Sequence, residues 1–318
     1  MQKAEKIKVI ILTGFLGAGK TTLLNNILSN DKGKLNFVIE NEFGKVSVDS
    51  TLVQKNYNQL FELNNGCICC SLDAELIEVL TQLIIAEKQP DCLYIEASGV
   101  ADAGMLASVF KRDDVLKYFN LTQVICLVDA ENFEDRVTEV PEMYRQIIAA
   151  DRILINKSDL VRPAYIKELE SRLKSLNPFA AIEPTIHGNF SIDPVPDRSM
   201  SNYAKIDQFQ TIETNAGHRM KSIAIAVPEE FDRDQLYASL SVTLYLHYHQ
   251  VYRIKGFVRL KGEENPVLLQ STGNKITLTA HTPSDSQKYF LVFIGRDIER
   301  KGLERILFGY KKEKVLEN

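Results

Sequence analysis

The residues from Gly14 to Thr21 have the types and spacing that bind the phosphate groups of a nucleotide. They read Gly-Phe-Leu-Gly-Ala-Gly-Lys-Thr, which fits every fixed position of the eight-residue phosphate-binding loop. The glycines let consecutive backbone amides face one concavity, and the positive end of the following helix adds to the attraction for phosphate oxygens. In such a loop Lys20 reaches the β- and γ-phosphates, and the Thr21 hydroxyl binds Mg²⁺. The predicted nucleotide-binding residues here are Gly14, Gly17, Ala18, Gly19, Lys20, Thr21 and Thr22.

A second motif, at residues 156–159, indicates which base the nucleotide carries. Asn156, Lys157 and Asp159 stand at the end of an apolar stretch that reads as a buried strand. The Asp159 carboxylate can accept hydrogen bonds from the ring N–H and the exocyclic amine of guanine, whereas adenine offers no such donor pair. The same four residues could begin a capped helix. Their place downstream of the phosphate loop favours guanine binding.

A third segment, Leu93–Gly99, reads as a hydrophobic strand that ends in the carboxylate of Glu96. A carboxylate at this place faces Mg²⁺ and the attacking water in nucleotide hydrolases, and Glu in place of the commoner Asp can act through a water molecule. Gly99 would let its backbone N–H approach the γ-phosphate, although Glu96 could also cap the next turn. Lys20, Thr21 and Glu96 are therefore the predicted catalytic residues. We find no obvious glutamine or arginine finger, so we expect slow intrinsic turnover.

Three thiols lie within four residues at Cys67, Cys69 and Cys70. Thiolates are ligands for soft divalent ions and disfavour Mg²⁺, and three of them with one oxygen or nitrogen ligand suit tetrahedral Zn²⁺. In an extended chain Cys70 would point away from the other two, so a bend is required, which Gly66 could supply. A redox-sensitive thiol switch and a set of buried, inert cysteines are the alternatives.

Length and composition exclude several classes of protein. The chain has 318 residues, enough for two domains, with 45% hydrophobic and 25% charged residues. No apolar run approaches the roughly 18 residues of a membrane span, and the net charge of −4 argues against nucleic acid as a partner. Five cysteines, three of them clustered, indicate a reduced, cytoplasmic protein rather than a disulfide scaffold. The apolar stretch near the first residue resembles a signal peptide but leads into the phosphate loop.

Alternating apolar runs and helical patterns up to residue 190 predict an α/β fold with a mostly parallel sheet of the P-loop NTPase type. Ligands then gather at the carboxyl ends of the strands. The expected strands are Lys8–Thr13, Leu35–Glu40, Gln59–Leu63, Cys92–Glu96, Val124–Asp129, Arg152–Asn156 and Ala181–Ile186. The expected helices are Thr21–Leu28, Ala74–Glu87, Glu142–Ala150 and Ala164–Leu176.

Residues 191–217 lack periodicity and read as a linker between domains 1–190 and 218–318. In the second domain strands outnumber helices and follow one another directly, which predicts a smaller α+β domain with an antiparallel sheet. The strands expected there are Ser222–Val227, Tyr252–Leu260, Val267–Ser271, Ile276–Thr279 and Tyr289–Ile294, with helices at Arg233–Ser241 and Ile298–Phe308. The sequence assigns no role to His187, His247 or His249.

These motifs, taken in order, resemble the CobW-like metal-handling GTPases, a branch of the P-loop GTPases. The resemblance rests on the phosphate loop, on Glu40–Gly44, on Gly66–Cys70, on the Glu96–Gly99 strand end and on Asn156–Asp159. It continues beyond the linker, where Arg253-Ile254-Lys255-Gly256 precedes an apolar stretch. A phosphate loop alone marks many families, whereas this cysteine motif beside it marks few.

The resemblance implies a GTP-dependent metallochaperone that binds GTP and Mg²⁺ in its first domain and Zn²⁺, or another thiophilic divalent ion, at Cys67, Cys69 and Cys70. Hydrolysis would gate transfer of the ion to a metal-requiring client protein. By the same analogy Glu42 belongs to the metal or switch region, although it could equally be a solvated loop carboxylate. Lys45 stands where relatives often place an acidic residue, and histidine-rich storage tracts are absent.

Two other functions are compatible with the motifs. One is a regulatory GTPase whose thiols sense redox state or metal without delivering it, and the other is a small-molecule phosphotransferase with the same loop. The sequence is also compatible with a homodimer. If switch residues 40–49 and the cysteine segment lie on neighbouring connections, nucleotide state and metal affinity should depend on each other.

Overall fold

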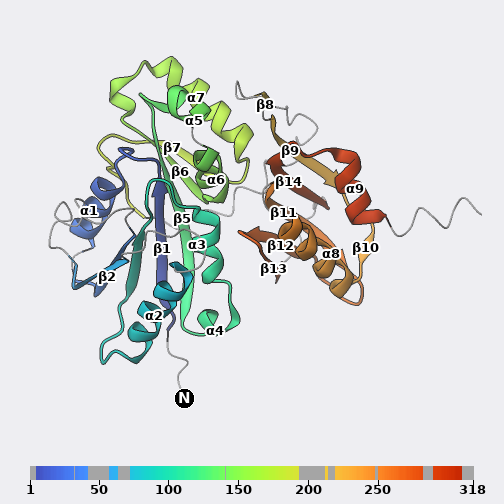
Figure 1. Ribbon diagram of the computed structural model, residues 1–318, viewed down its shortest axis with the longest axis horizontal. Helices are drawn as coiled ribbons and strands as arrows, with labels where there is room; N and C mark the ends of the chain where they lie inside the picture. Colours follow the sequence, from blue (N-terminus) through green and yellow to red (C-terminus); the bar gives the residue numbers. More distant parts are fainter. Residues whose placement is uncertain are drawn as a thin grey trace, which may run out of the picture. The chain divides into compact units, whose positions relative to one another are not determined.

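Figure 1 shows a computed structural model of the chain, which describes residues 5–31, 33–41, 57–63, 72–139, 141–192, 212–213, 219–247, 250–281 and 289–309. The chain divides into two compact units, residues 1–174 with 178–199 and residues 175–177 with 200–318. Each unit is built around its own sheet.

The first unit contains a sheet in the strand order β3-β2-β4-β1-β5-β6-β7, in which every neighbouring pair runs parallel. This confirms the predicted parallel sheet. The strands are β1 Ile7–Gly14, β2 Asn36–Asn41, β3 Gln59–Leu63, β4 Cys92–Glu96, β5 Phe119–Asp129, β6 Arg152–Asn156 and β7 Ala181–Pro184. Because the strands are parallel, their carboxyl ends share one edge of the sheet, where the loops that carry the predicted site begin.

Helices cover both faces of this sheet, as strand β1 shows. Val9 and Ile11 pack in a core with residues of α2 and α3, whereas Ile10 and Leu12 pack in a second core with residues of α1. Alternate residues of a strand point to opposite faces, so a strand buried on both sides is apolar throughout. The helical segments are α1 Lys20–Asn30, α2 Leu72–Ile85, α3 Ala103–Val109, α4 Asp113–Leu116, α5 Phe133–Glu139, α6 Pro141–Ala149, η2 Ser158–Leu160 and α7 Pro163–Leu176.

The second unit has an antiparallel sheet in the order β13-β12-β11-β14-β9-β8, with the short β10 beside β11, which confirms the predicted smaller α+β domain. Two residues that we expected in the linker, Ile212 and Glu213, form β8 and pair with β9. The elements are β8 Ile212–Glu213, β9 Arg219–Ala226, β10 Glu230–Phe231, α8 Arg233–Leu246, β11 Val251–Leu260, β12 Val267–Thr272, β13 Lys275–Ala280, β14 Phe290–Arg296 and α9 Arg300–Phe308.

Helix α8 is five residues longer than the sequence predicted and has two chemically different faces. Leu236, Leu240 and Leu244 repeat every four residues and are buried in the core with the sheet. Val242 and Tyr245 are 54% and 77% exposed on the other side. The Asp232 side chain accepts hydrogen bonds from the backbone N–H groups of residues 234 and 235, which fixes the start of the helix.

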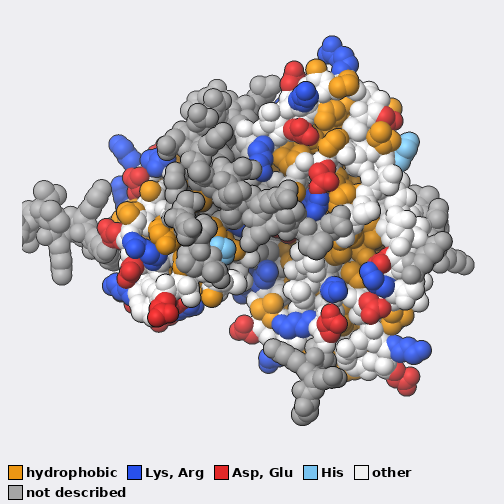
Figure 2. Space-filling model, turned by 180° about the vertical axis from the view of Figure 1, so that it is seen from behind, with side chains coloured by type: hydrophobic (Ala, Val, Ile, Leu, Met, Phe, Trp, Pro, Cys, Tyr) orange, Lys and Arg blue, Asp and Glu red, His pale blue; other side chains and the backbone are white. Residues whose placement is uncertain are grey.

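The described surface is mixed in character. On the face drawn in Figure 2, basic and acidic side chains are interspersed among apolar ones over the first unit. Such interspersed charge is typical of a solvated surface. Within the described residues, every helix is too short or too polar to cross a membrane.

The two faces of α8 give a test of the core of the second unit. Leu240→Ala removes a fully buried side chain and should lower the free energy of unfolding by about 2–5 kcal/mol, whereas the exposed Val242→Ala should change it by less than about 0.5 kcal/mol. Urea unfolding followed by circular dichroism measures both. Equal losses in the two variants would contradict the packing described for α8.

Candidate functional site

The phosphate loop joins β1 to α1 with a backbone that only glycine adopts without strain. Gly14, Gly17 and Gly19 have φ values of 138°, 76° and 98°. A Cβ atom on Gly14 would lie 2.3 Å from the carbonyl oxygen of Leu127, so a larger residue would also collide with β5. Lys20 is buried at 8% exposure, and its Nζ donates to the Gly14 carbonyl oxygen at 3.0 Å. The loop therefore holds its cation close to its own backbone.

The structure brings Thr21 and Glu96 together at the end of β4. The Thr21 Oγ1 donates to Glu96 Oε1 at 2.7 Å, and Glu96 is buried at 6% exposure. Strand β4 lies directly beside β1, with Leu12 opposite Glu96, so the carboxylate reaches the first turn of α1. A hydroxyl and a carboxylate oxygen are the donor types that Mg²⁺ prefers.

A second buried carboxylate, Glu40, lies on the neighbouring strand β2 at the same register as Glu96. Residues opposite each other on parallel strands point to the same face, so these two carboxylates share one side of the sheet edge. The sequence placed Glu40 in the switch motif without assigning it a role as a ligand. A carboxylate that ends the apolar run Phe37–Ile39 was the signal that could have drawn attention to it.

Asn156 ties the phosphate loop to the end of β6 and to the turn after β7. Its Nδ2 donates to the Ala18 carbonyl oxygen at 2.9 Å, and its Oδ1 accepts from the Gly188 backbone N–H at 3.0 Å. It is only 3% exposed, and a Cβ atom on Gly19 would lie 2.4 Å from its Nδ2. One side chain thus fixes the loop, the end of β6 and the turn after β7 relative to one another.

The following residue, Lys157, is in the left-handed region with φ 58° and points toward β5. Its Nζ donates to Asp129 Oδ2 at 2.8 Å, and the Asn132 amide donates to the same oxygen at 2.9 Å. Burial opposes ionisation of Asp129, but the hydrogen bonds from Lys157 and Asn132 outweigh it and hold the pKa of this carboxyl below its usual range. Asp159 lies exposed in η2, where its carboxylate is open to a ligand.

Gly99 lies against the phosphate loop, and its own position is held by Gln146 of α6. A Cβ atom on Gly99 would lie 2.7 Å from the backbone nitrogen of Leu16. The Gln146 Nε2 donates to the carbonyl oxygens of Gly99 and Ala101 at 2.9 and 3.3 Å, and the side chain is 1% exposed. The sequence analysis missed Gln146, although an amide within an amphipathic helix was a weak signal.

The histidines take peripheral places among the described residues. His187 has φ 51°, and its carbonyl oxygen accepts a hydrogen bond from Asn26 at 2.8 Å. His247 caps the C-terminus of α8, and His249 lies outside the described residues.

The predicted metal ligands Cys67, Cys69, Cys70 and Glu42 also lie outside the described residues. Within the described ranges, the side chains form no group of three or more candidate ligands. Burial raises the pKa of the Cys92 thiol to about 11 and that of Cys126 to about 12, so both stay protonated and are poor ligands at neutral pH.

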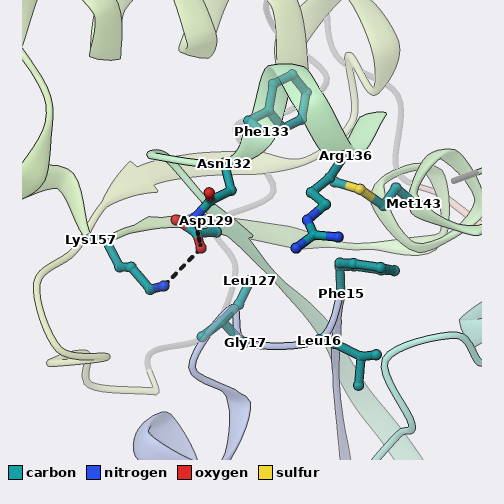
Figure 3. A pocket seen from close by; sticks show the side chains of 10 residues that line it. All are labelled: Phe15, Leu16, Gly17, Leu127, Asp129, Asn132, Phe133, Arg136, Met143 and Lys157. Carbon is teal, nitrogen blue, oxygen red and sulfur yellow. Dashed lines mark hydrogen bonds and ion pairs between the residues drawn. The ribbon is translucent and has the colours of Figure 1, made fainter. Parts of the chain in front are cut away.

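A pocket of about 160 Å³ opens beside the phosphate loop on the β5 side (Figure 3). It is bounded by the loop tip, the ends of β5 and β6, and the helices α5 and α6. The lining residues are Phe15, Leu16, Gly17, Leu127, Asp129, Asn132, Phe133, Arg136, Met143 and Lys157.

Comparison with protein families matches both units of the chain. The CobW/HypB/UreG nucleotide-binding domain matches residues 8–183, and the cobalamin synthesis protein cobW C-terminal domain matches residues 220–310. The chain belongs to the CobW/HypB/UreG family. This confirms the resemblance drawn from the motifs and places the chain among P-loop GTPases.

Several curated relatives of this family are named for zinc. The chain is 31% identical over 317 residues to zinc chaperone YjiA of Escherichia coli K12, with 96% of this chain and 99% of that protein covered. It is 27% identical to zinc chaperone CobW of a Sinorhizobium species, covering 85% and 86%. It is 32% identical over 192 residues to zinc-regulated GTPase metalloprotein activator 1 of Schizosaccharomyces pombe, covering 58% of this chain and 47% of that protein.

Solved structures of a CobW/HypB/UreG family member share the fold. The Zn(II)-bound YjiA GTPase from E. coli has a TM-score of 0.67 and 27% identity, with 96% of this chain and 99% of that chain covered. A Zn(II)-bound triple mutant of YjiA GTPase has a TM-score of 0.68 and 26% identity over the same coverage. The likeness covers both units of the chain.

The lowered pKa of Asp129 predicts how acid affects the site. A carboxyl whose pKa is lower in the folded state contributes stability above its unfolded pKa of about 4, and this contribution is lost as pH falls through the folded pKa. Asp129→Asn should therefore be less stable than wild type at pH 6, and the difference should shrink toward pH 2.5. Urea unfolding at both pH values measures it, with the exposed Glu131→Gln as control. A difference that grows in acid would contradict the account.

Proposed function

We propose that this chain is a GTPase that binds Zn²⁺ and couples GTP hydrolysis to transfer of the ion to a metal-requiring client protein. The observation that carries the proposal is the 2.7 Å contact between Thr21 and Glu96, which joins the phosphate loop to the strand beside β2. The names of the relatives, zinc chaperone and zinc-regulated GTPase metalloprotein activator, support zinc as the cargo. The clustered thiols support a reduced, cytoplasmic setting.

In the proposed complex the backbone amides of Gly14, Gly17, Ala18 and Gly19, with Lys20 and Thr22, hold the GTP phosphates. Thr21 and Glu96 would hold Mg²⁺, which neutralises charge on the β- and γ-phosphates when bound. The contact that Lys20 makes with the Gly14 carbonyl oxygen keeps its charge within the loop, so little rearrangement is needed to meet a phosphate.

Asp159 would select guanine, and Asn156 and Lys157 would place the base. The contacts of Asn156 with Ala18 and Gly188 support this assignment, because they fix the phosphate loop relative to the end of β6 and the turn after β7. The exposure of Asp159 leaves its carboxylate available to the two guanine donors.

Hydrolysis requires that the segment after β4 meet the γ-phosphate. We propose that the Gly99 N–H approaches that phosphate and that Glu96 acts beside it, as catalytic and metal-holding groups. Gln146 is a positioning residue, since its two hydrogen bonds fix the carbonyl groups of Gly99 and Ala101. Without an arginine or glutamine finger in this segment, turnover of the chain alone should be slow.

The topology supports a link between nucleotide and metal. Glu42 follows one residue after β2, and Cys67 follows four residues after Leu63, the last residue of β3. Four residues span at most about 14 Å, and neighbouring strands are about 4.8 Å apart. Because β3, β2 and β4 are neighbours with parallel direction, the segments that contain the proposed ligands Cys67, Cys69, Cys70 and Glu42 leave the sheet at the edge that carries Glu96.

The experiment that tests the proposal is a zinc titration of the protein with GDP and with a non-hydrolysable GTP analogue. We expect zinc affinities that differ by at least about fivefold between the two nucleotides. Zn²⁺ should also reach a chromogenic chelator faster with GTP than with the analogue. Equal affinities and equal release rates would contradict the chaperone function and favour a GTPase that only senses metal or redox state.

Two cysteine variants assign the effect to the predicted ligands. Cys69→Ser should lose most of its zinc affinity while GTP binding is largely kept. Cys92→Ala is the matched control, because it removes a buried thiol that the protein keeps protonated. An unchanged zinc affinity in Cys69→Ser, or an equal loss in both variants, would contradict the assignment.

A further inference from the structure

The strongest unassigned feature of the first unit is the guanidinium of Arg136 in the pocket beside the phosphate loop. Arg136 lies on α5, and its guanidinium carbon is 5.4 Å from the centre of the Phe15 ring, within the loop itself. Figure 3 shows the guanidinium pointing into the pocket, with the Lys157 ammonium entering from the opposite side. Two cations therefore converge next to a loop built for anions.

These two cations differ in how they are neutralised. Lys157 is paired with Asp129 at 2.8 Å. Arg136 makes no ion pair with any carboxylate in the part of the chain that the structure describes, and its side chain is exposed. With one carboxylate and two cations, the pocket retains a positive charge, which favours an anionic ligand.

Helix α5 holds Arg136 in place through buried contacts. Phe133 and Val137 are 0% and 1% exposed, and Asn132 links the start of the helix to Asp129. The Arg136 guanidinium carbon lies over the Phe15 ring, and this cation–π contact favours a position beside the loop tip. Helix α5, which carries the Arg136 guanidinium, is thus linked through Asn132 and Asp129 to Lys157 of the guanine motif.

The strand order indicates which part of a nucleotide meets this cation. Glu96 and Thr21 lie on the β4 side of the loop, where Mg²⁺ and the γ-phosphate are expected. The pocket lies on the other side, between the loop tip and Lys157 of the guanine motif. In the proposed complex, a nucleotide that extends from the loop to residues 156–159 would bring its non-transferred phosphates toward this pocket.

We propose that Arg136 binds a non-transferred phosphate of the guanine nucleotide, from the β5 side of the phosphate loop. This inference rests on the proposed GTP binding and adds a residue that none of the motifs contains. A charge-assisted hydrogen bond from a guanidinium to a phosphate oxygen would strengthen GDP and GTP binding alike.

The test compares Arg136→Met with wild type in calorimetric titrations of GDP, a non-hydrolysable GTP analogue and guanosine. Methionine is an unbranched apolar side chain, so this variant removes the guanidinium with its charge and its N–H donors. We expect affinity for GDP and for the analogue to fall by about 10- to 100-fold, with guanosine binding unchanged. Arg136→Lys should restore part of the loss, since it returns the charge without the planar fork.

Arg172→Met is the matched control, because the Arg172 guanidinium lies 5.2 Å from the centre of the Phe133 ring but outside the pocket lining. It should bind all ligands as wild type does. Unchanged GDP affinity in Arg136→Met, or an equal loss for guanosine, would overturn the inference while leaving GTP binding intact. A wild-type protein that binds no guanine nucleotide would overturn the inference together with the proposed function.

Discussion

The hydrogen bond between Thr21 and Glu96 is the contact on which the rest of the site depends. It joins the first turn of α1 to the end of β4 and thereby sets where the phosphate loop stands relative to the sheet edge. Strand β2, which carries the buried Glu40 and leads into the segment proposed as a switch, pairs with β4 on its other side. A ligand that displaces Thr21 or Glu96 would therefore act at the end of β4. This strand pairs with β2, which leads to Glu42.

The other side of the loop is fixed independently of this contact. Asn156 holds the loop to β6, and Asp129 gathers Lys157 and Asn132 at the end of β5. The loop is therefore fixed on the β5 and β6 side, where we propose that the base binds. On the β4 side, where we propose that the γ-phosphate binds, the segment is held through Gln146. This asymmetry suits a switch, because a γ-phosphate contact can reorder one side while the nucleotide stays bound on the other.

The sequence predicted those parts of the fold and the site whose signals are contiguous. The residues from Gly14 to Thr21 and from Asn156 to Asp159 are each read within one short segment, and the double burial of the parallel strands makes them apolar runs. The sequence analysis gave no role to Glu40 or Gln146, because the residues near them in the structure come from other strands and loops. Helices α3, α4 and α5 have seven, four and seven residues, too few for a clear helical period.

Coupling between the two ligand sites can be measured from the nucleotide side. The affinity of a non-hydrolysable GTP analogue is determined by calorimetry with and without one equivalent of Zn²⁺, in the presence of Mg²⁺. If nucleotide binding at the phosphate loop is coupled to zinc binding at the metal ligands, zinc should change the affinity for the analogue by at least about fivefold. The analogue should change the affinity for zinc by the same factor. An affinity for the analogue that is identical with and without zinc would contradict the account.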